Sequence, residues 1–168
     1  ISLNGVVTKK AIKVAGDVMD HDIQNYFRNT HRLEIGDRTA EQIKISVGSA
    51  MRSRSKNILV KGRDLVSGIP KTIDVRSDEI RQALKDSVKR ILEVVKDALE
   101  STPPELSSDI IDRGILVAGG GAQLRGLDQV IREKTNVPCN VVEEPHLAIV
   151  KGCGKIIEDL EKYKHVLI

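Results

Sequence analysis

The chain has 168 residues, which is enough for one domain, or for one domain with an inserted lobe, and for a core of normal size. It is 40% hydrophobic and 30% charged, a composition typical of a soluble globular protein. Its 27 basic and 24 acidic residues are well mixed and give a net charge of +3, while only 2% of the residues are aromatic. Mixed charge without aromatic stacking platforms argues against nucleic acid as a partner.

The two cysteines, Cys139 and Cys153, form no Cys-x-x-Cys pair, and no histidine stands at ligand spacing. We therefore predict no zinc site and no disulfide framework, and expect both residues to be buried free thiols in a reducing cytosol. No apolar run approaches the roughly 18 residues needed to span a bilayer, and no signal peptide is recognisable. The predicted location is cytoplasmic.

The first elements are a hairpin and a helix. Ile1 to Leu3, the pair Asn4-Gly5 and the following valines predict two strands joined by a type I′ turn, with residues 10–14 completing a strand. Because the first strand would have only three residues, we expect the chain to be a fragment of a longer protein. A helix is predicted over 17–31, where Asp17 can cap and apolar residues form a stripe.

The middle of the chain predicts a second helix over 39–48, in which Thr39 and Gln42 have capping-box spacing. Two β-like stretches, 57–61 and 71–75, then predict a hairpin. A long amphipathic helix is expected from Ser77 to about Glu100, where the two prolines that follow rule out its continuation.

The last third predicts a βαβ unit with a parallel strand pair: strand 115–118, helix 122–134 and strand 139–142. A final helix is expected over about 147–163. Gly152 and Gly154 within it each cost about 1 kcal/mol relative to alanine, so we expect a close neighbour to require them.

The most informative segment joins the strand at 115–118 to three consecutive glycines, residues 119–121. Glycine permits a positive φ and leaves no Cβ to obstruct a base or phosphate, and a helix N-terminus offers unpaired N–H groups. The segment matches no standard phosphate-binding fingerprint, because Leu124 replaces the third Rossmann glycine and Leu127 replaces the P-loop lysine. From these residues alone, a nucleotide site and a tight connection without a ligand both remain open.

Four segments, in this order, resemble the C-terminal large domain of the MreB family of bacterial actins, within the actin/Hsp70/sugar-kinase ATPase superfamily. They are Val14-Ala-Gly-Asp-Val-Met-Asp20, Ile35-Gly-Asp-Arg-Thr-Ala-Glu-Gln-Ile-Lys44, Val117-Ala-Gly-Gly-Gly-Ala-Gln-Leu-Arg-Gly-Leu127 and Glu144-Pro-His-Leu-Ala-Ile-Val-Lys-Gly-Cys-Gly154. The resemblance implies an α/β fold: half of an actin-like, ribonuclease H-like ATPase with an inserted small α+β subdomain. Residues 1–16 and 78–168 would form subdomain IIA, the nucleotide-binding core, and residues 17–77 the inserted subdomain IIB.

The resemblance also implies a nucleotide site. Gly119, Gly120, Gly121 and Ala122 correspond to the adenosine motif, and Glu41, Gln42, Ile43 and Lys44 to the helix segment that closes over the other side of the adenosine. Positions i and i+3 share a helix face, so the Glu41 carboxylate can accept ribose hydroxyls while the Lys44 stem covers the purine. From the residues alone, the favoured interpretation of Glu41 and Lys44 is a surface ion pair that contributes roughly a few tenths of a kcal/mol.

The implied parent protein is an ATP-binding, filament-forming cytoskeletal protein that maintains cell shape. It would be cytoplasmic and membrane-associated, would self-associate into protofilaments and would have cell-shape and membrane-associated partners. Its ATP would be bound together with Mg²⁺, which would be held mainly by residues outside this chain. The attacking water would also be held by residues outside this chain. We therefore predict no catalytic and no metal-binding residue here: the parent would be a slow ATPase, and this chain alone would not be catalytic.

Two alternatives remain. The chain could be a fragment of another ATPase of the same fold, an Hsp70-like chaperone or a sugar kinase. It could also be a dinucleotide-binding module, in which Glu143 or Glu144 at the end of the second strand would bind a ribose.

Overall fold

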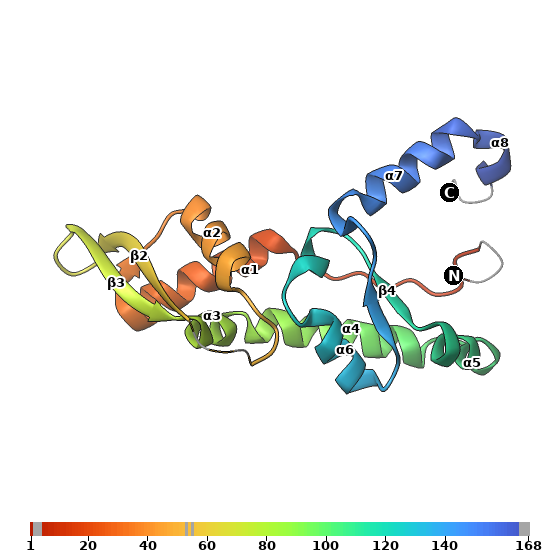
Figure 1. Ribbon diagram of the computed structural model, residues 1–168, viewed down its shortest axis with the longest axis horizontal. Coiled ribbons are helices and arrows are strands. Elements are labelled where there is room, and N and C mark those ends of the chain that lie inside the picture. Colours follow the sequence, from red (N-terminus) through yellow and green to blue (C-terminus); the bar gives the residue numbers. More distant parts are fainter. Residues whose placement is uncertain (2–4, 53, 55, 165–168) are drawn as a thin grey trace. The chain divides into compact units, whose positions relative to one another are not determined.

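The computed structural model describes residues 1, 5–52, 54 and 56–164 and divides into two compact units. Figure 1 labels the helices α1 to α8 and the strands β2 to β4. Unit 1 comprises residues 1–12, 92–123 and 128–168, and unit 2 comprises residues 13–91 and 124–127. Each unit combines helices with a small sheet, so the predicted α/β character is confirmed.

Unit 2 begins with helix α1 (Gly16–Tyr26), which continues as a π-helical turn, η1 (Phe27–His31). The helix predicted over 17–31 is therefore confirmed. Met19, Ile23 and Phe27 recur every four residues, and all three are buried. This spacing places them on one face, which is the face that packs into the core.

Helix α2 (Asp37–Val47) packs against α1. It begins two residues before the predicted start at Thr39, because Gly36 adopts the extended N-cap conformation (φ −79°, ψ 164°). The predicted capping box between Thr39 and Gln42 is therefore wrong. The reciprocal capping arrangement lies elsewhere, where the Glu79 carboxylate accepts a hydrogen bond from the Arg76 backbone N–H at 3.1 Å.

The sheet of unit 2 has the order β1-β2-β3 and is antiparallel throughout. Strands β2 (Asn57–Asp64) and β3 (Pro70–Arg76) form the predicted hairpin, extended at both strands, and β1 (Leu33–Glu34) adds to β2. Gly62 allows this addition, since a Cβ there would lie 2.4 Å from the Glu34 carbonyl oxygen.

The long helix predicted from Ser77 to Glu100 is wrong as a single element. It is divided into α3 (Ser77–Ala83) and α4 (Lys85–Glu100), with Leu84 between them at φ −82° and ψ −5°. Leu84 is fully buried, its N–H donates to the Ile80 carbonyl, and its carbonyl accepts from the Val88 N–H. The apolar periodicity therefore continues across the break. Periodicity alone could not reveal the break at Leu84.

One core joins the helices and strands of unit 2. Its buried apolar residues are Met19, Ile23, Phe27, Leu33, Ile35, Ala40, Ile43, Val47, Val60, Val75, Ile80, Leu84, Val88, Leu124 and Leu127.

Unit 1 contains the predicted parallel strand pair, β4 (Ile115–Val117) with β5 (Cys139–Val141). The connecting helix α6 (Leu127–Thr135) begins five residues later than predicted. Residues 120–123 form instead a short 3₁₀ turn, η2 (Gly120–Gln123). The glycines therefore do not stand at the N-terminus of an α-helix. The prediction that unpaired N–H groups of a helix N-terminus follow them directly is wrong.

The predicted strand at 10–14 is also wrong: residues 6–14, all within the described part of the chain, have no strand. The first strand and Asn4 of the predicted hairpin lie mostly on residues 2–4, outside the described residues. Helix α5 (Pro104–Arg113) was not predicted. Pro104 occupies its first turn, where a missing N–H costs nothing, so the proline pair ends one helix and begins another.

The final helix is divided into α7 (Pro145–Glu158) and α8 (Leu160–Tyr163) at Asp159, whose carboxylate accepts a hydrogen bond from the Lys162 N–H. A Cβ added at Gly152 or Gly154 would meet no atom of the described residues within 4 Å. The close neighbour expected for these glycines is therefore absent from the described structure.

Both cysteines are free, but only one is buried. Cys139 on β5 is fully buried, and burial raises the pKa of its thiol. Cys153 on α7 is exposed. The expectation of a buried free thiol is therefore confirmed for Cys139 and wrong for Cys153.

Candidate functional site

The glycine turn follows β4 directly, and the conformation of its first residue explains the need for glycine. Gly119 has φ +88°, a value that side chains strongly disfavour. Its N–H donates to the Pro145 carbonyl at 2.7 Å, and its carbonyl accepts from the Ala122 N–H at 3.2 Å. The first hydrogen bond connects the glycine turn to the first turn of α7, and the second stabilises the turn internally.

Gly120 and Gly121 have a different reason to lack a side chain. Neither has a positive φ, and a Cβ at either position would meet nothing within 4 Å among the described residues. Packing within the chain therefore does not require glycine at these two positions. Ala122, in contrast, is buried and anchors the turn. The two open glycines leave bare backbone that a flat ligand could approach closely, which fits the base and ribose of a nucleotide.

The four predicted residues of α2 differ in what they present. Glu41 and Gln42 are exposed, whereas Ile43 is buried in the core of unit 2. The Lys44 ammonium group is not free: it donates to the Asp20 carboxylate at 2.8 Å and to the Gly16 carbonyl at 2.9 Å. Glu41 and Gln42 can therefore reach a ligand with their polar groups, and Lys44 only with its methylene stem.

Glu41 to Lys44 belong to unit 2 and Gly119 to Ala122 to unit 1. Residues 124–127, two positions after the turn, pack within unit 2 on the segment that follows α2. The Ala50 N–H donates to the Arg125 carbonyl at 2.8 Å, and Gly126 lies against the Met51 side chain. Residues 124–127 therefore pack within unit 2, although they follow the glycine turn of unit 1 closely in the sequence.

Glu144, one of the two acidic residues named for the dinucleotide alternative, is engaged at the start of α7. Its carboxylate accepts a hydrogen bond from Lys151, and this contact lowers the pKa of Glu144. It also adopts a left-handed conformation (φ 45°) at the start of α7. A ribose would have to compete with the Lys151 ammonium group for this carboxylate.

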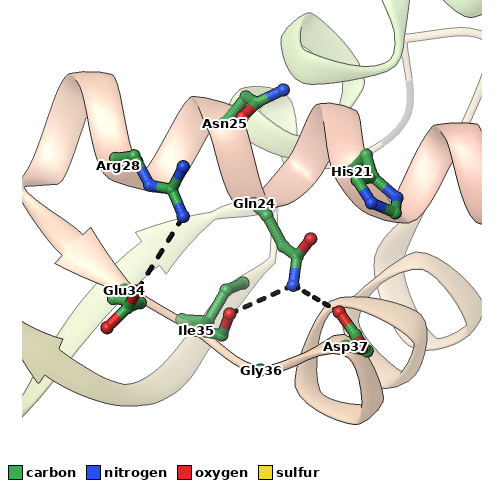
Figure 2. A pocket seen from close by; sticks show the side chains of 8 residues that line it. All are labelled: His21, Gln24, Asn25, Arg28, Glu34, Ile35, Gly36 and Asp37. Atoms are coloured by element: carbon green, nitrogen blue, oxygen red, sulfur yellow. Dashed lines mark hydrogen bonds and ion pairs between the residues drawn. The ribbon is translucent and has the colours of Figure 1, made fainter.

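A groove lies within unit 2, between α1 and the segment that enters α2 (Figure 2). It has a volume of about 540 Å³ and is open to solvent. One wall comes from α1, the other from residues 34–37. Sequence reasoning missed this groove, although its α1 wall is a polar stripe at helical spacing: His21, Gln24, Asn25 and Arg28.

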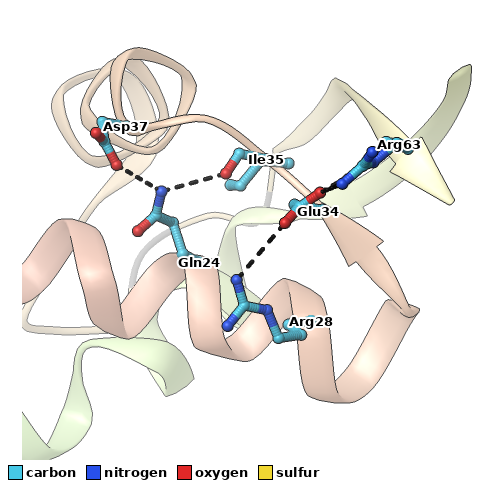
Figure 3. Close-up of polar contacts among 6 residues, drawn as sticks. All are labelled: Gln24, Arg28, Glu34, Ile35, Asp37 and Arg63. Atoms are coloured by element: carbon cyan, nitrogen blue, oxygen red, sulfur yellow. Dashed lines mark hydrogen bonds and ion pairs between the residues drawn. The ribbon is translucent and has the colours of Figure 1, made fainter. Parts of the chain in front are cut away.

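Hydrogen bonds and an ion pair connect the two walls of this groove, as Figure 3 shows. The Gln24 amide donates to the Ile35 carbonyl at 3.2 Å and to Asp37 at 2.8 Å. Glu34 binds Arg63 on one side and lies 3.9 Å from the Arg28 guanidinium on the other. The lining residues carry one positive charge, on Arg28, and two negative charges, on Glu34 and Asp37, so the groove has only a small excess of negative charge.

Among the described residues, no group of three or more histidines, cysteines or carboxylates is arranged to hold a metal ion. The same part of the chain has no helix with the length and apolarity that a membrane crossing requires.

A sequence model of the MreB/Mbl protein family matches residues 1–165. The chain is 47% identical, over 163 residues, to the cell shape-determining protein Mbl of Bacillus subtilis (strain 168), covering 96% of this chain and 49% of Mbl. The chain thus spans about half the length of the curated relatives it matches.

Solved structures agree. MreB5 of Spiroplasma citri bound to ADP superposes with a TM-score of 0.89 at 34% identity, over 94% of this chain and 48% of MreB5. A double helical filament of MamK matches with a TM-score of 0.74, over 88% of this chain and 46% of MamK, and at 22% identity it shows the fold alone. The fold is that of half an actin-like ATPase, and the chain belongs to the MreB/Mbl family.

Proposed function

We propose that this chain is the adenosine-binding and protofilament-contact half of an ATP-binding, filament-forming protein that maintains cell shape. Family membership supports this function over the sugar-kinase and Hsp70-like alternatives. The observation that carries it is the open backbone at Gly120 and Gly121, because nothing in the described chain requires glycine there. That MreB5 has been solved with ADP, and MamK as a filament, is consistent with it.

In this proposal, residues 1–16 and 78–168 form subdomain IIA, and residues 17–77 form subdomain IIB. The glycine turn contacts the base and ribose on one side. The exposed Glu41 carboxylate accepts ribose hydroxyls on the other, and the Lys44 stem covers the purine. Mg²⁺ and the phosphates are bound mainly by residues outside this chain, and the parent acts in the cytoplasm at the membrane.

Calorimetric titration of the 168-residue chain with ATP tests the nucleotide site. We expect a dissociation constant of about 1 mM or weaker, equivalent to about 4 kcal/mol, because the phosphate-binding elements are not part of the proposed site. Gly121→Val should abolish the binding without loss of stability, since its side chain would enter open space. Gly36→Val, at a glycine equally free of neighbours, is the matched control. Low-micromolar affinity, or equal binding by both variants, would contradict the proposed site.

A further inference from the structure

The ion pair between Lys44 and Asp20 joins the two helices of unit 2. Lys44 lies in the last turn of α2, and Asp20 lies on α1. Their closest atoms, Nζ and Oδ2, are 2.8 Å apart, and each side chain is only 16% exposed. The Gly16 carbonyl at the start of α1 accepts a second hydrogen bond from the same ammonium group.

Burial makes each partner depend on the other. A charged group removed from water is costly unless it is paired and hydrogen-bonded. The second carboxylate oxygen of Asp20, Oδ1, is buried and has no hydrogen-bond partner among the described residues. Lys44 is therefore the side chain that compensates the Asp20 charge, and Asp20 is the group that keeps the Lys44 ammonium directed at α1.

This orientation changes what Lys44 offers to a ligand. A free ammonium group would attract any phosphate, whatever base it carries. An ammonium group neutralised by Asp20 leaves the methylene stem as the contacting surface, and a stem recognises a flat apolar base by shape. Asp20 itself need not touch the nucleotide.

We propose that Asp20 is a positioning residue: by holding the Lys44 ammonium group on α1, it makes the Lys44 stem an adenine-recognising surface. This inference rests on the proposed adenosine site and names the residue that gives the site its dependence on the base. The inference is based on the partly buried contact of Asp20, Lys44 and Gly16 within unit 2, which is independent of the glycine turn.

The test compares adenosine monophosphate with ribose 5-phosphate, which differs from it by the base. Dissociation constants come from NMR titrations of the 168-residue chain. We expect Asp20→Asn to lower the preference for adenosine monophosphate over ribose 5-phosphate about threefold or more, a coupling typical of contacting residues, because the freed ammonium group would attract the phosphate of either ligand. Asp22→Asn is the matched control, because this α1 carboxylate binds Ser87 at 2.5 Å and not Lys44. Asp20→Glu, which keeps the charge, should restore part of the preference.

A second measurement needs no nucleotide. Pulse acetylation followed by mass spectrometry should show faster labelling of Lys44 in Asp20→Asn than in the wild type or in Asp22→Asn. An unchanged Lys44 labelling rate would overturn the inference.

A double-mutant cycle covers the case in which Asp20→Asn folds poorly. Lys44→Met keeps an apolar stem and removes the charge, so adding Asp20→Asn to Lys44→Met should cause no further loss of affinity. A further loss would mean that Asp20 acts other than through Lys44 and would overturn the inference. So would an equal effect of Asp20→Asn and Asp22→Asn. If the wild type does not distinguish the two ligands, the adenosine site itself fails, whereas a wild-type preference that survives Asp20→Asn refutes the positioning role alone.

Discussion

In unit 2, two packed helices and a three-stranded sheet bury their apolar residues in one core, whereas unit 1 leaves many of its own in solvent. The buried apolar residues of the described chain that belong to unit 1 are Ala122, Ile131, Val137 and Cys139. Its exposed ones include Ile111, Leu116, Ile149, Val150, Ile157 and Leu160. Unit 2 also exposes large apolar side chains, among them Leu59 and Val66, so the contrast between the units lies in their buried residues. Unit 2 has the more complete core.

Leucine-to-alanine substitutions make this contrast quantitative. Leu33 on β1 is fully buried, and Leu116 on β4 is 69% exposed. Leu33→Ala should lower the free energy of unfolding by about 2–5 kcal/mol, because it removes buried methyl groups and leaves a cavity. Leu116→Ala should change it by about 0.5 kcal/mol or less. Urea denaturation followed by tyrosine fluorescence measures the two effects separately. A Tyr163→Phe background leaves Tyr26 as the reporter for Leu33→Ala in unit 2, and a Tyr26→Phe background leaves Tyr163 as the reporter for Leu116→Ala in unit 1.

Equal losses from the two leucine variants would mean that Leu116 is covered in solution and would remove the contrast between the units. A small loss for Leu33→Ala would mean instead that unit 2 is loosely packed.

The second prediction concerns the charge network of unit 2. The Glu79 carboxylate accepts hydrogen bonds from His31 at 2.7 Å, from the Arg76 N–H at 3.1 Å and from the Tyr26 hydroxyl at 3.2 Å. Partial burial opposes ionisation of Glu79, but these hydrogen bonds and the attraction of His31 outweigh it and lower the Glu79 pKa below its usual 4.5. A lowered pKa in the folded state stabilises the protein above pH 4.5, and this contribution is lost as the pH falls through the folded-state pKa.

Unit 2 should therefore lose stability below pH 4.5, and Glu79→Gln should remove that part of the pH dependence. At pH 7 the substitution should cost about 1 kcal/mol, the net value of a typical hydrogen bond. Thermal melts between pH 3 and pH 7 measure both effects, with Glu158→Gln, an exposed carboxylate in unit 1, as the control. A parallel pH profile for Glu79→Gln and the wild type would refute the role assigned to the network.

Features that depend on local periodicity were predictable from the sequence. The helix of α1 and η1 with Ile23 and Phe27 on its buried face, the hairpin of β2 and β3 and the parallel pair of β4 and β5 all appear where expected, whereas Val18 and Tyr26, also predicted for that face, are only partly buried. Features that depend on partners were not. Residues 10–14 have a strand-like sequence but no strand, because a strand needs a neighbour to bond.

The candidate site divides in the same way. Three consecutive glycines already indicated a backbone with special requirements, and Gly119 indeed has a positive φ. The contact between Lys44 and Asp20 could not be predicted, because the residues are 24 positions apart and meet only through the packing of α1 on α2. Hydrophobic pattern determines which faces pack, but the polar side chains that meet beside those faces depend on the detailed geometry of the packing.

The last prediction tests whether α7 of unit 1 has room for an added methyl group. Gly154→Ala should stabilise α7 by about 1 kcal/mol, because alanine favours the helix and its methyl group would enter open space. Gly62→Ala in unit 2 should instead destabilise, since its Cβ would lie 2.4 Å from the Glu34 carbonyl oxygen. Amide hydrogen exchange in α7 and β2 measures the two effects separately. Slower exchange in α7 of Gly154→Ala supports an uncovered helix, whereas faster exchange would mean that α7 packs in solution against a neighbour that leaves no room for a methyl group.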